Sequence, residues 1–86
     1  MKVSLYVFTS DNLDNNQNCK LKNRIKVCRV EKELTQEKLG KLINVTRQTI
    51  AVIEQGRQEP TLTMALKIAC IFDKKLEEIF YYEREA

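Results

Sequence analysis

Arg47, Gln48 and Thr49 follow one another directly in the middle of the chain, immediately after Thr46. Their side chains have the donors and acceptors needed to hydrogen-bond the edges of nucleic-acid bases. An arginine can bond O6 and N7 of guanine together, and a glutamine can bond N6 and N7 of adenine together. For Gln48 we favour base contact, whereas for Arg47 a contact with a backbone phosphate is an equally good interpretation.

Two short predicted helices joined by a tight turn position these side chains. Residues 36–55 read QEKLGKLINVTRQTIAVIEQ. Thr35 and Thr46 precede the two helices, and a threonine at that position accepts an orphan backbone N–H of the first turn. Gly40 has no side chain, so the second helix, residues 47–55, can cross close to the first. The expected inward residues are Leu39, Ile43, Val45, Ile50 and Ile53.

This spacing predicts a helix-turn-helix, in which the second helix is presented to the DNA major groove. A helical hairpin with only a structural role is the alternative. Asn44 stands at the reversal, where a left-handed backbone is needed and asparagine is tolerated. Gly56 is expected to end the second helix in the same conformation.

Three further helices complete the predicted fold. The first covers residues 22–32, with Ile25 and Cys28 inward and Val27 and Val30 more exposed. The fourth is capped by Thr61, and the fifth is short. Their expected apolar positions are Leu62, Ala65, Leu66, Ala69 and Phe72 in the fourth, and Leu76, Ile79 and Phe80 in the fifth. The sequence therefore predicts an all-α, compact five-helix domain over residues 21–86.

Charge is unevenly distributed along the 86 residues, whose formal net charge is +3 and whose pI is about 8.8. Glutamates gather near the C-terminus, whereas a short segment before the hairpin is basic, with Lys20, Lys22, Arg24, Lys26, Arg29 and Lys32. A basic pole fits a polyanionic partner, and an ordinary solvated helix face is the alternative. Direct contact with the polyanion is one interpretation of Lys22, Lys26, Lys38 and Lys41. Simple solvation, or loose electrostatic steering of the partner, is an equally good one.

The residue types of this sequence do not indicate an enzyme active site or a metal site. The chain has no histidine and no nucleophile–base constellation. Cys19, Cys28 and Cys70 lack the paired spacing of a zinc or redox motif, so we expect neither metal nor cofactor. Cys28 is expected to be a small core residue, with a redox switch as the alternative. Reduced thiols suit a cytoplasmic protein.

Residues 1–20 are expected to form an N-terminal arm or linker, either mobile or a short strand. Its apolar part, MKVSLYVFT, is too short for a secretory signal or a membrane span. We therefore expect no membrane partner. A second hypothesis is that Leu21 is the natural start, because the compact domain begins there.

The segments LTQEKL, VTRQTI, IEQGRQEPTL and LEEIF resemble the phage-repressor type of helix-turn-helix, the Cro/CI or Xre family of transcriptional regulators. The resemblance covers residues 22 to about 82. It implies a lambda-repressor-like five-helix domain that binds a double-stranded DNA operator, commonly as a homodimer. The chain departs from the family at Asn44 and Asp73, where glycine is common, and at Lys75, which replaces a small capping residue before the last helix. It also departs at Glu33, where glycine or asparagine is frequent, so the first turn is expected to be strained.

The resemblance also implies roles for particular residues. Gln36 would bond a phosphate and buttress the recognition helix, and Arg57 would grip phosphate together with the N-terminus of the fourth helix. Arg29 and Glu54 would form an internal salt bridge. The predicted DNA-binding set is Gln36, Thr46, Arg47, Gln48, Thr49, Val52 and Arg57.

Dimerisation is expected because one short recognition helix makes too few base contacts for selective binding. The predicted interface is the apolar and aromatic C-terminal end, with Leu76, Ile79, Phe80, Tyr81 and Tyr82. Some relatives pair residues before the first helix with the tail as a small sheet, and residues 18–22 and 80–83 are placed to do so here.

The leading functional prediction is a sequence-specific DNA-binding transcriptional regulator, such as a repressor, that works as a homodimer. The alternative is a protein-interaction module, such as the antitoxin half of a toxin–antitoxin pair, whose arm or tail grips a partner. The sequence indicates no small-molecule ligand for either function.

Overall fold

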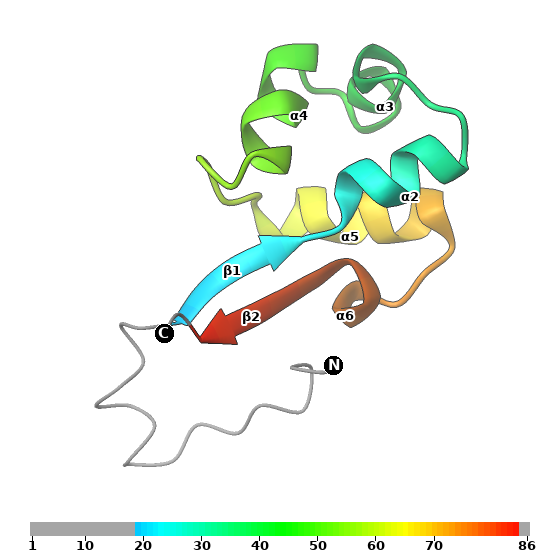
Figure 1. Cartoon of the computed structure of the whole chain (residues 1–86). Coiled ribbons are helices and arrows are strands. Elements are labelled where there is room, and N and C mark those ends of the chain that lie inside the picture. Colours follow the sequence, from blue (N-terminus) through cyan, green and yellow to red (C-terminus); the bar gives the residue numbers. More distant parts are fainter. Residues whose placement is uncertain (1–18, 85–86) are drawn as a thin grey trace.

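The structure is a computed structural model that describes residues 19–84. Five helices and two strands follow one another along these residues (Figure 1). They are β1 (Cys19–Asn23), α2 (Ile25–Glu31), α3 (Gln36–Ile43), α4 (Arg47–Glu54), α5 (Leu62–Phe72), α6 (Leu76–Ile79) and β2 (Phe80–Arg84). None of these helices has the length and apolar character needed to cross a membrane.

A two-stranded antiparallel sheet, hereafter the ribbon, corrects the prediction of an all-α fold. Strands β1 and β2 pair with Leu21 opposite Tyr82. The pairing continues where Arg24 N–H donates to the Ile79 carbonyl at 2.8 Å, so the chain enters α2 beside the place where it leaves α6. Aromatic residues such as Tyr81 and Tyr82 favour strands. The five predicted helices are confirmed, and so is the predicted pairing of the residues before the first helix with those after the last.

The ribbon includes Cys19 and Lys20, which fall within the expected arm of residues 1–20. The rest of that arm, including Asn18 of the expected pairing, lies outside the described residues. β2 extends one residue beyond the expected pairing, to Arg84.

The first helix is shorter than predicted, because residues 22 and 23 belong to β1 and α2 begins at Ile25. Asn23 explains this start. Its Oδ1 accepts a hydrogen bond from Ile25 N–H at 3.1 Å, while its Nδ2 donates to the Ile53 carbonyl at 2.9 Å. An asparagine side chain that satisfies a nearby backbone N–H favours the beginning of a helix over its interior.

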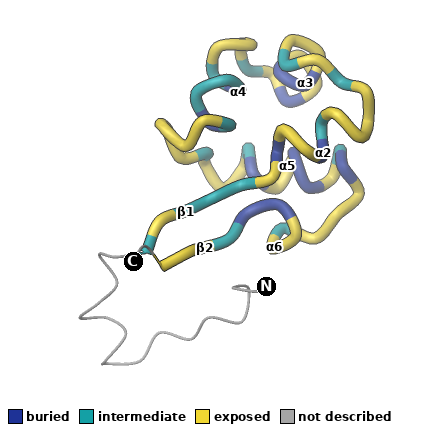
Figure 2. Tube along the Cα trace, in the orientation of Figure 1, coloured by how far each residue is buried: buried dark blue, intermediate teal, exposed yellow. Residues whose placement is uncertain are grey.

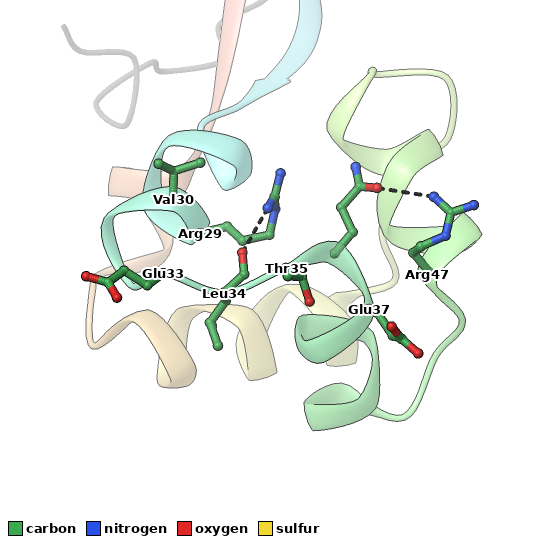
Figure 3. Close-up of a pocket in the computed structure, with 8 residues that line it drawn as sticks. Arg29, Val30, Glu33, Leu34, Thr35, Glu37 and Arg47 are labelled. Carbon is green, nitrogen blue, oxygen red and sulfur yellow. Dashed lines mark hydrogen bonds between the residues drawn. The ribbon is translucent and has the colours of Figure 1, made fainter.

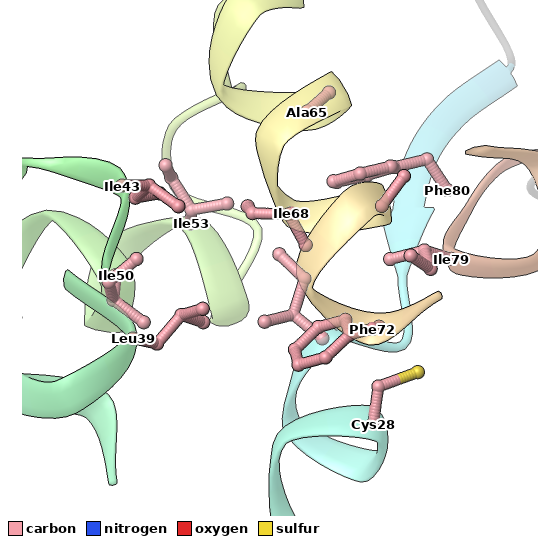
Figure 4. Packing of buried hydrophobic residues seen from close by; sticks show 12 residues of the cluster. Cys28, Leu39, Ile43, Ile50, Ile53, Ala65, Ile68, Phe72, Ile79 and Phe80 are labelled. Atoms are coloured by element: carbon pink, nitrogen blue, oxygen red, sulfur yellow. The ribbon is translucent and has the colours of Figure 1, made fainter. Parts of the chain in front are cut away.

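The core lies where the helices face one another, as Figures 2 and 4 show. The side chains of Ile25, Leu39, Ile50 and Ile53 are 0–1% exposed, and Val45 packs against them. The inward set predicted for the hairpin is therefore confirmed. Cys28 is also buried, which confirms its prediction as a core residue. The full buried set is Ile25, Cys28, Leu39, Ile43, Ile50, Ile53, Ala65, Ile68, Ala69, Phe72, Ile79 and Phe80.

Helix α5 buries Ala65, Ala69 and Phe72 as predicted, but its buried stripe continues through Ile68 rather than through Leu62 and Leu66. Leu62 and Leu66 are 69% and 49% exposed, whereas Ile68 is completely buried. The residues that face the core are Ala65, Ile68, Ala69 and Phe72. Both stripes recur at three and four residues, so helical periodicity is compatible with either. Packing against the other helices decides which stripe is covered.

Side-chain caps and left-handed residues set the helix ends as predicted. Each of the three predicted threonine caps, Thr35, Thr46 and Thr61, accepts a backbone N–H from three residues ahead. Glu33, Asn44, Asp73 and Gly56 have positive φ angles of 58°, 65°, 54° and 76°. Glu33 has neither the short polar side chain of Asn or Asp nor the freedom of glycine, so its backbone is strained, as expected.

The crossing of α3 and α4 depends on Gly40. A Cβ atom placed there would lie 2.7 Å from the backbone carbonyl oxygen of Val45 in the turn. The missing side chain thus lets the turn, rather than α4 itself, lie directly on α3. At the last helix, the Glu78 carboxylate accepts from Lys75 N–H at 2.7 Å and caps α6 in place of a small residue.

Candidate nucleic-acid interface

Helix α4 presents a polar leading edge and buries its opposite face. Arg47 and Gln48 are exposed, whereas Ile50 and Ile53 lie in the core. Thr46 Oγ1 accepts from Thr49 N–H at 3.1 Å and lies 2.9 Å from the Thr49 hydroxyl. The start of the helix is therefore ordered and open to solvent, with the partial positive charge of a helix N-terminus beside an arginine.

Gln36 connects α3 to both ends of α4. Its Nε2 donates to Glu54 Oε1 at 3.1 Å. Its Oε1 accepts from Arg47 Nη1 at 3.3 Å, the bond drawn as a dashed line to Arg47 in Figure 3. The buttressing role predicted for Gln36 is therefore present in the structure. The contact of Gln36 with a phosphate stays a prediction. In the structure, the oxygen and the nitrogen of its side-chain amide both form hydrogen bonds with other side chains of the protein.

The predicted salt bridge between Arg29 and Glu54 is present and largely buried. Arg29 Nε lies 2.7 Å from Glu54 Oε2, and the two side chains are only 12% and 5% exposed. Arg29 Nη1 also donates to the Leu34 carbonyl at 2.8 Å (Figure 3). This network joins α2, the segment before α3 and the end of α4, so the orientation of α4 is determined by charge-assisted bonds as well as by packing.

An open hollow beside this network separates α2 from the start of α4 (Figure 3). Its walls carry Glu33 and Glu37 together with Arg29 and Arg47. Because its carboxylates and guanidiniums are mixed, the hollow is poorly suited to a phosphate group. On this side of the molecule, the exposed start of α4 is therefore better suited to an anion than the hollow is.

The loop after α4 brings a further cation to the same helix. Gly56 adopts the predicted left-handed conformation, and the exposed Arg57 follows it. Arg57 Nη1 donates to Gln55 Oε1 at 3.3 Å. Val52, the last member of the predicted DNA-binding set, is half-buried because its side chain packs against the core.

The residues predicted for a dimer interface do not share one surface. Ile79 and Phe80 are 0% and 9% exposed, so the monomer's own core covers them. Leu76 and Tyr81 are half-buried, and Tyr82 is 39% exposed. Of the predicted residues, Leu76, Tyr81 and Tyr82 keep exposed surface, and Tyr81 and Tyr82 lie on opposite faces of the ribbon. The dimer interface stays a prediction, without Ile79 and Phe80.

Sequence reasoning missed Asn23 and the contact between Arg24 and Tyr81. The Arg24 guanidinium lies 4.2 Å from the centre of the Tyr81 ring, a cation–π contact between the start of α2 and β2. Asn23 carries a local signal, since asparagine commonly precedes a helix. The Arg24–Tyr81 contact joins residues far apart in the sequence and has no comparable signal.

Burial raises the pKa of the Cys28 thiol. A thiol with a raised pKa forms little of the reactive thiolate at neutral pH. This chemistry supports the core role of Cys28 over the redox alternative.

Comparison with known proteins matches residues 25–79 to a family model described as Helix-turn-helix (HTH_3). YgzD of Bacillus subtilis (strain 168) is 46% identical over 65 residues, which are 76% of this chain and 98% of that protein. MJ0272 of Methanocaldococcus jannaschii (strain ATCC 43067) is 49% identical over 63 residues, 73% of this chain and 96% of that protein. Both relatives are named uncharacterized HTH-type transcriptional regulators.

A solved structure has a similar fold over most of this chain. It is a crystal structure from Bacteroides fragilis, described as a proposed DNA-binding protein, with a TM-score of 0.65 and 27% identity. The match covers 70% of this chain and 97% of that chain. The chain belongs to the Cro/CI-type (Xre) helix-turn-helix family of transcriptional regulators.

Proposed function

We propose that this protein is a sequence-specific regulator that places α4 in the major groove of double-stranded DNA. The observation that carries the proposal is the exposed start of α4, where Arg47 and Gln48 point away from the core while Gln36 and Thr46 hold the backbone and side chains around them. A recognition helix reads base edges with residues near its N-terminus. The family relationship supports the same function.

The bonds around α4 make it a rigid reading element. Arg29, Gln36 and Glu54 connect it to α2 and α3 before any ligand arrives. Side chains that are already positioned lose less conformational entropy when they bind. Gln48, which is exposed at the start of this fixed helix, is assigned to base recognition. Arg47, whose guanidinium donates to Gln36, is assigned to a base or a phosphate.

Arg57 and the first turn of α5 are assigned to phosphate contacts. Arg57 is exposed directly after α4, and Thr61 caps α5. Cations and helix N-termini bind backbone phosphates without sequence information, and they set the register of the protein on the duplex.

We further propose that two copies bind a two-fold operator. Helix α4 has eight residues and is therefore about 12 Å long, which limits it to a few base pairs. Two recognition helices about one helical turn apart would give a site long enough to be selective. Leu76 and Tyr82 supply the proposed contact surface, because Tyr81 points to the opposite face of the ribbon from Tyr82.

Selection from a random duplex pool at two salt concentrations tests this function. The parent should enrich one site, with half-sites about one helical turn apart. Gln48→Ala should relax the preference at defined base pairs by about 1–3 kcal/mol, whereas Arg57→Ala should weaken all sequences alike and lower the salt slope by about one.

The two variants serve as controls for each other, because both change exposed residues at or just after α4. If Gln48→Ala weakens every duplex equally, Gln48 does not read bases. If the parent enriches no sequence at either salt concentration, sequence-specific recognition is wrong.

A further inference from the structure

One face of the ribbon carries three cations. Successive side chains of a strand point to opposite faces, so Lys20 and Lys22 share one face, opposite Glu83 and Tyr81 of β2. The Arg24 guanidinium lies over the Tyr81 ring, at 4.2 Å from its centre, and therefore on the same side. On the same face the ribbon also carries one carboxylate, that of Glu83. With three cations and one carboxylate from these residues, the face has a net positive charge.

This basic face adjoins the end of α4. An open cleft of about 250 Å³ lies between them, and Lys20, Lys22 and Tyr81 line it from the ribbon. Gln55 and Gly56 line it from the end of α4. Glu54 also borders the cleft, but its carboxylate bonds Arg29 and Gln36 and so its charge is already paired.

A hydrogen bond at the inner end of the ribbon connects it to α4, because Asn23 Nδ2 donates to the Ile53 carbonyl at 2.9 Å. A second bond, from Arg24 N–H to the Ile79 carbonyl at 2.8 Å, holds the same end of the ribbon to α6. The lysines of β1 therefore hold a defined position relative to the recognition helix. A duplex bound by α4 would therefore have a defined position relative to these lysines.

We infer that the basic face of the ribbon binds backbone phosphates of DNA that flank the base pairs read by α4. This inference rests on the proposed function. Its chemical basis is charge complementarity, because a duplex carries one phosphate per 3.4 Å along each strand. Its geometric basis is the continuity of Lys20 and Lys22 with the end of α4 across the cleft. The ribbon thus lengthens the DNA contact beyond the helix-turn-helix and adds affinity without base preference.

The salt dependence of DNA binding tests the inference. The probe is a random-sequence duplex of about 30 base pairs, titrated at several salt concentrations, because each phosphate contact contributes about 0.9 to the slope. Lys20→Ala/Lys22→Ala should reduce the slope by about one to two, with a uniform loss of affinity. Lys20→Arg/Lys22→Arg, which keeps both charges, should retain the parental slope.

A matched control removes two lysines elsewhere. Lys67→Ala/Lys74→Ala makes the same change of net charge in the second half of α5 and the turn after it, at the end of α5 remote from α4 (Figure 1). It should leave the slope nearly unchanged. An equal fall in both double variants would show a general charge effect and overturn the inference, and so would an unchanged slope in Lys20→Ala/Lys22→Ala.

Glu83→Gln tests the inference from the opposite direction, because it removes a negative charge from the ribbon face and leaves both lysines in place. It deletes the carboxylate of the same ribbon face, so binding to the random duplex should tighten at low salt. Glu77→Gln, an exposed carboxylate on α6, is its control and should have a smaller effect. If the two variants behave alike, the ribbon face has no special contact with DNA. A parent that binds no duplex would instead refute the proposed function itself.

Discussion

Individual side chains in this protein act by connecting elements as much as by facing a ligand. Gln36 bonds Arg47 at one end of α4 and Glu54 at the other, and Glu54 in turn bonds Arg29. A residue that the family resemblance assigns to DNA contact is thus also part of the scaffold. Substitution of Gln36 would change both roles, which makes Gln48 and Arg57 better probes of DNA binding.

Glu54→Ala should strongly destabilise the fold. It removes the acceptor of Arg29 Nε and of Gln36 Nε2, and the Arg29 side chain is only 12% exposed. Breaking a largely buried ion pair by deleting one partner costs about 3 kcal/mol or more, because an unpaired charge stays buried. Thermal or urea unfolding measures the loss.

Glu37→Ala is the control for that measurement. Glu37 lies 3.9 Å from Lys41 on α3, and both side chains are more than 60% exposed, at 67% and 77%. Removing such a surface pair changes stability by less than about 1 kcal/mol. Equal unfolding midpoints for Glu54→Ala and the parent would show that the Arg29–Glu54 bond contributes little.

At the scale of elements, the helix-turn-helix depends on how closely the turn approaches α3. The carbonyl of Val45 occupies the space where Gly40 lacks a side chain. Asn44 supports the approach, because its left-handed backbone reverses the chain immediately after α3. A larger side chain at Gly40 would therefore displace the turn and, with it, the start of α4.

Gly40→Val should destabilise the protein by about 3 kcal/mol and weaken DNA binding, because its branched side chain cannot fit against the turn backbone. Leu42→Val is the matched control. It introduces the same residue on the same helix at a position that is 58% exposed, and it should cost only a few tenths of a kcal/mol. Unfolding curves of the two variants make the comparison. A small and equal loss in both would contradict the close-packing role of Gly40.

At the scale of the whole molecule, the chain is a small helical body with a projecting ribbon (Figure 1). The body has one recognition helix, and the ribbon extends beyond it. Under the proposed function, a second copy would supply the selectivity, and the ribbon would lengthen the DNA contact of each copy. The two proposals predict different results, since loss of dimerisation alters site selection and loss of the ribbon lysines alters the salt slope.

Sedimentation should show a dimer at tens of micromolar, as a rough working range, and Tyr82→Glu should shift it toward monomer. Tyr82 is 39% exposed, so a charge there is expected to disturb a partner's surface more than the monomer's core. Leu62→Glu is the control, because Leu62 is 69% exposed on α5, outside the proposed interface. A parent that sediments as a monomer throughout this range would contradict a stable dimer. An effect of Leu62→Glu alone would place the interface elsewhere.

Much of this architecture is determined locally and can be read from the sequence. The threonine caps, the reversal at Asn44 and the inward isoleucines of the hairpin act over three or four residues, and all were predicted correctly. The interactions behind these features are short-range. A capping threonine, for example, accepts a hydrogen bond from a backbone N–H in the first turn of its own helix. The polar start of α4 could also be predicted locally, because the helical period places its polar residues opposite the buried isoleucines.

Other features were decided only by the tertiary structure. Helix α5 has two apolar stripes of equal periodicity, and contact with the core selected Ile68 over Leu62 and Leu66. The start of α2 and the presence of the ribbon depend on bonds between distant residues, such as Asn23 with Ile53. Burial of Ile79 and Phe80 removed them from the predicted interface for the same reason. Local sequence determines which segments can form helices, whereas the faces they bury depend on the elements that the fold brings against them.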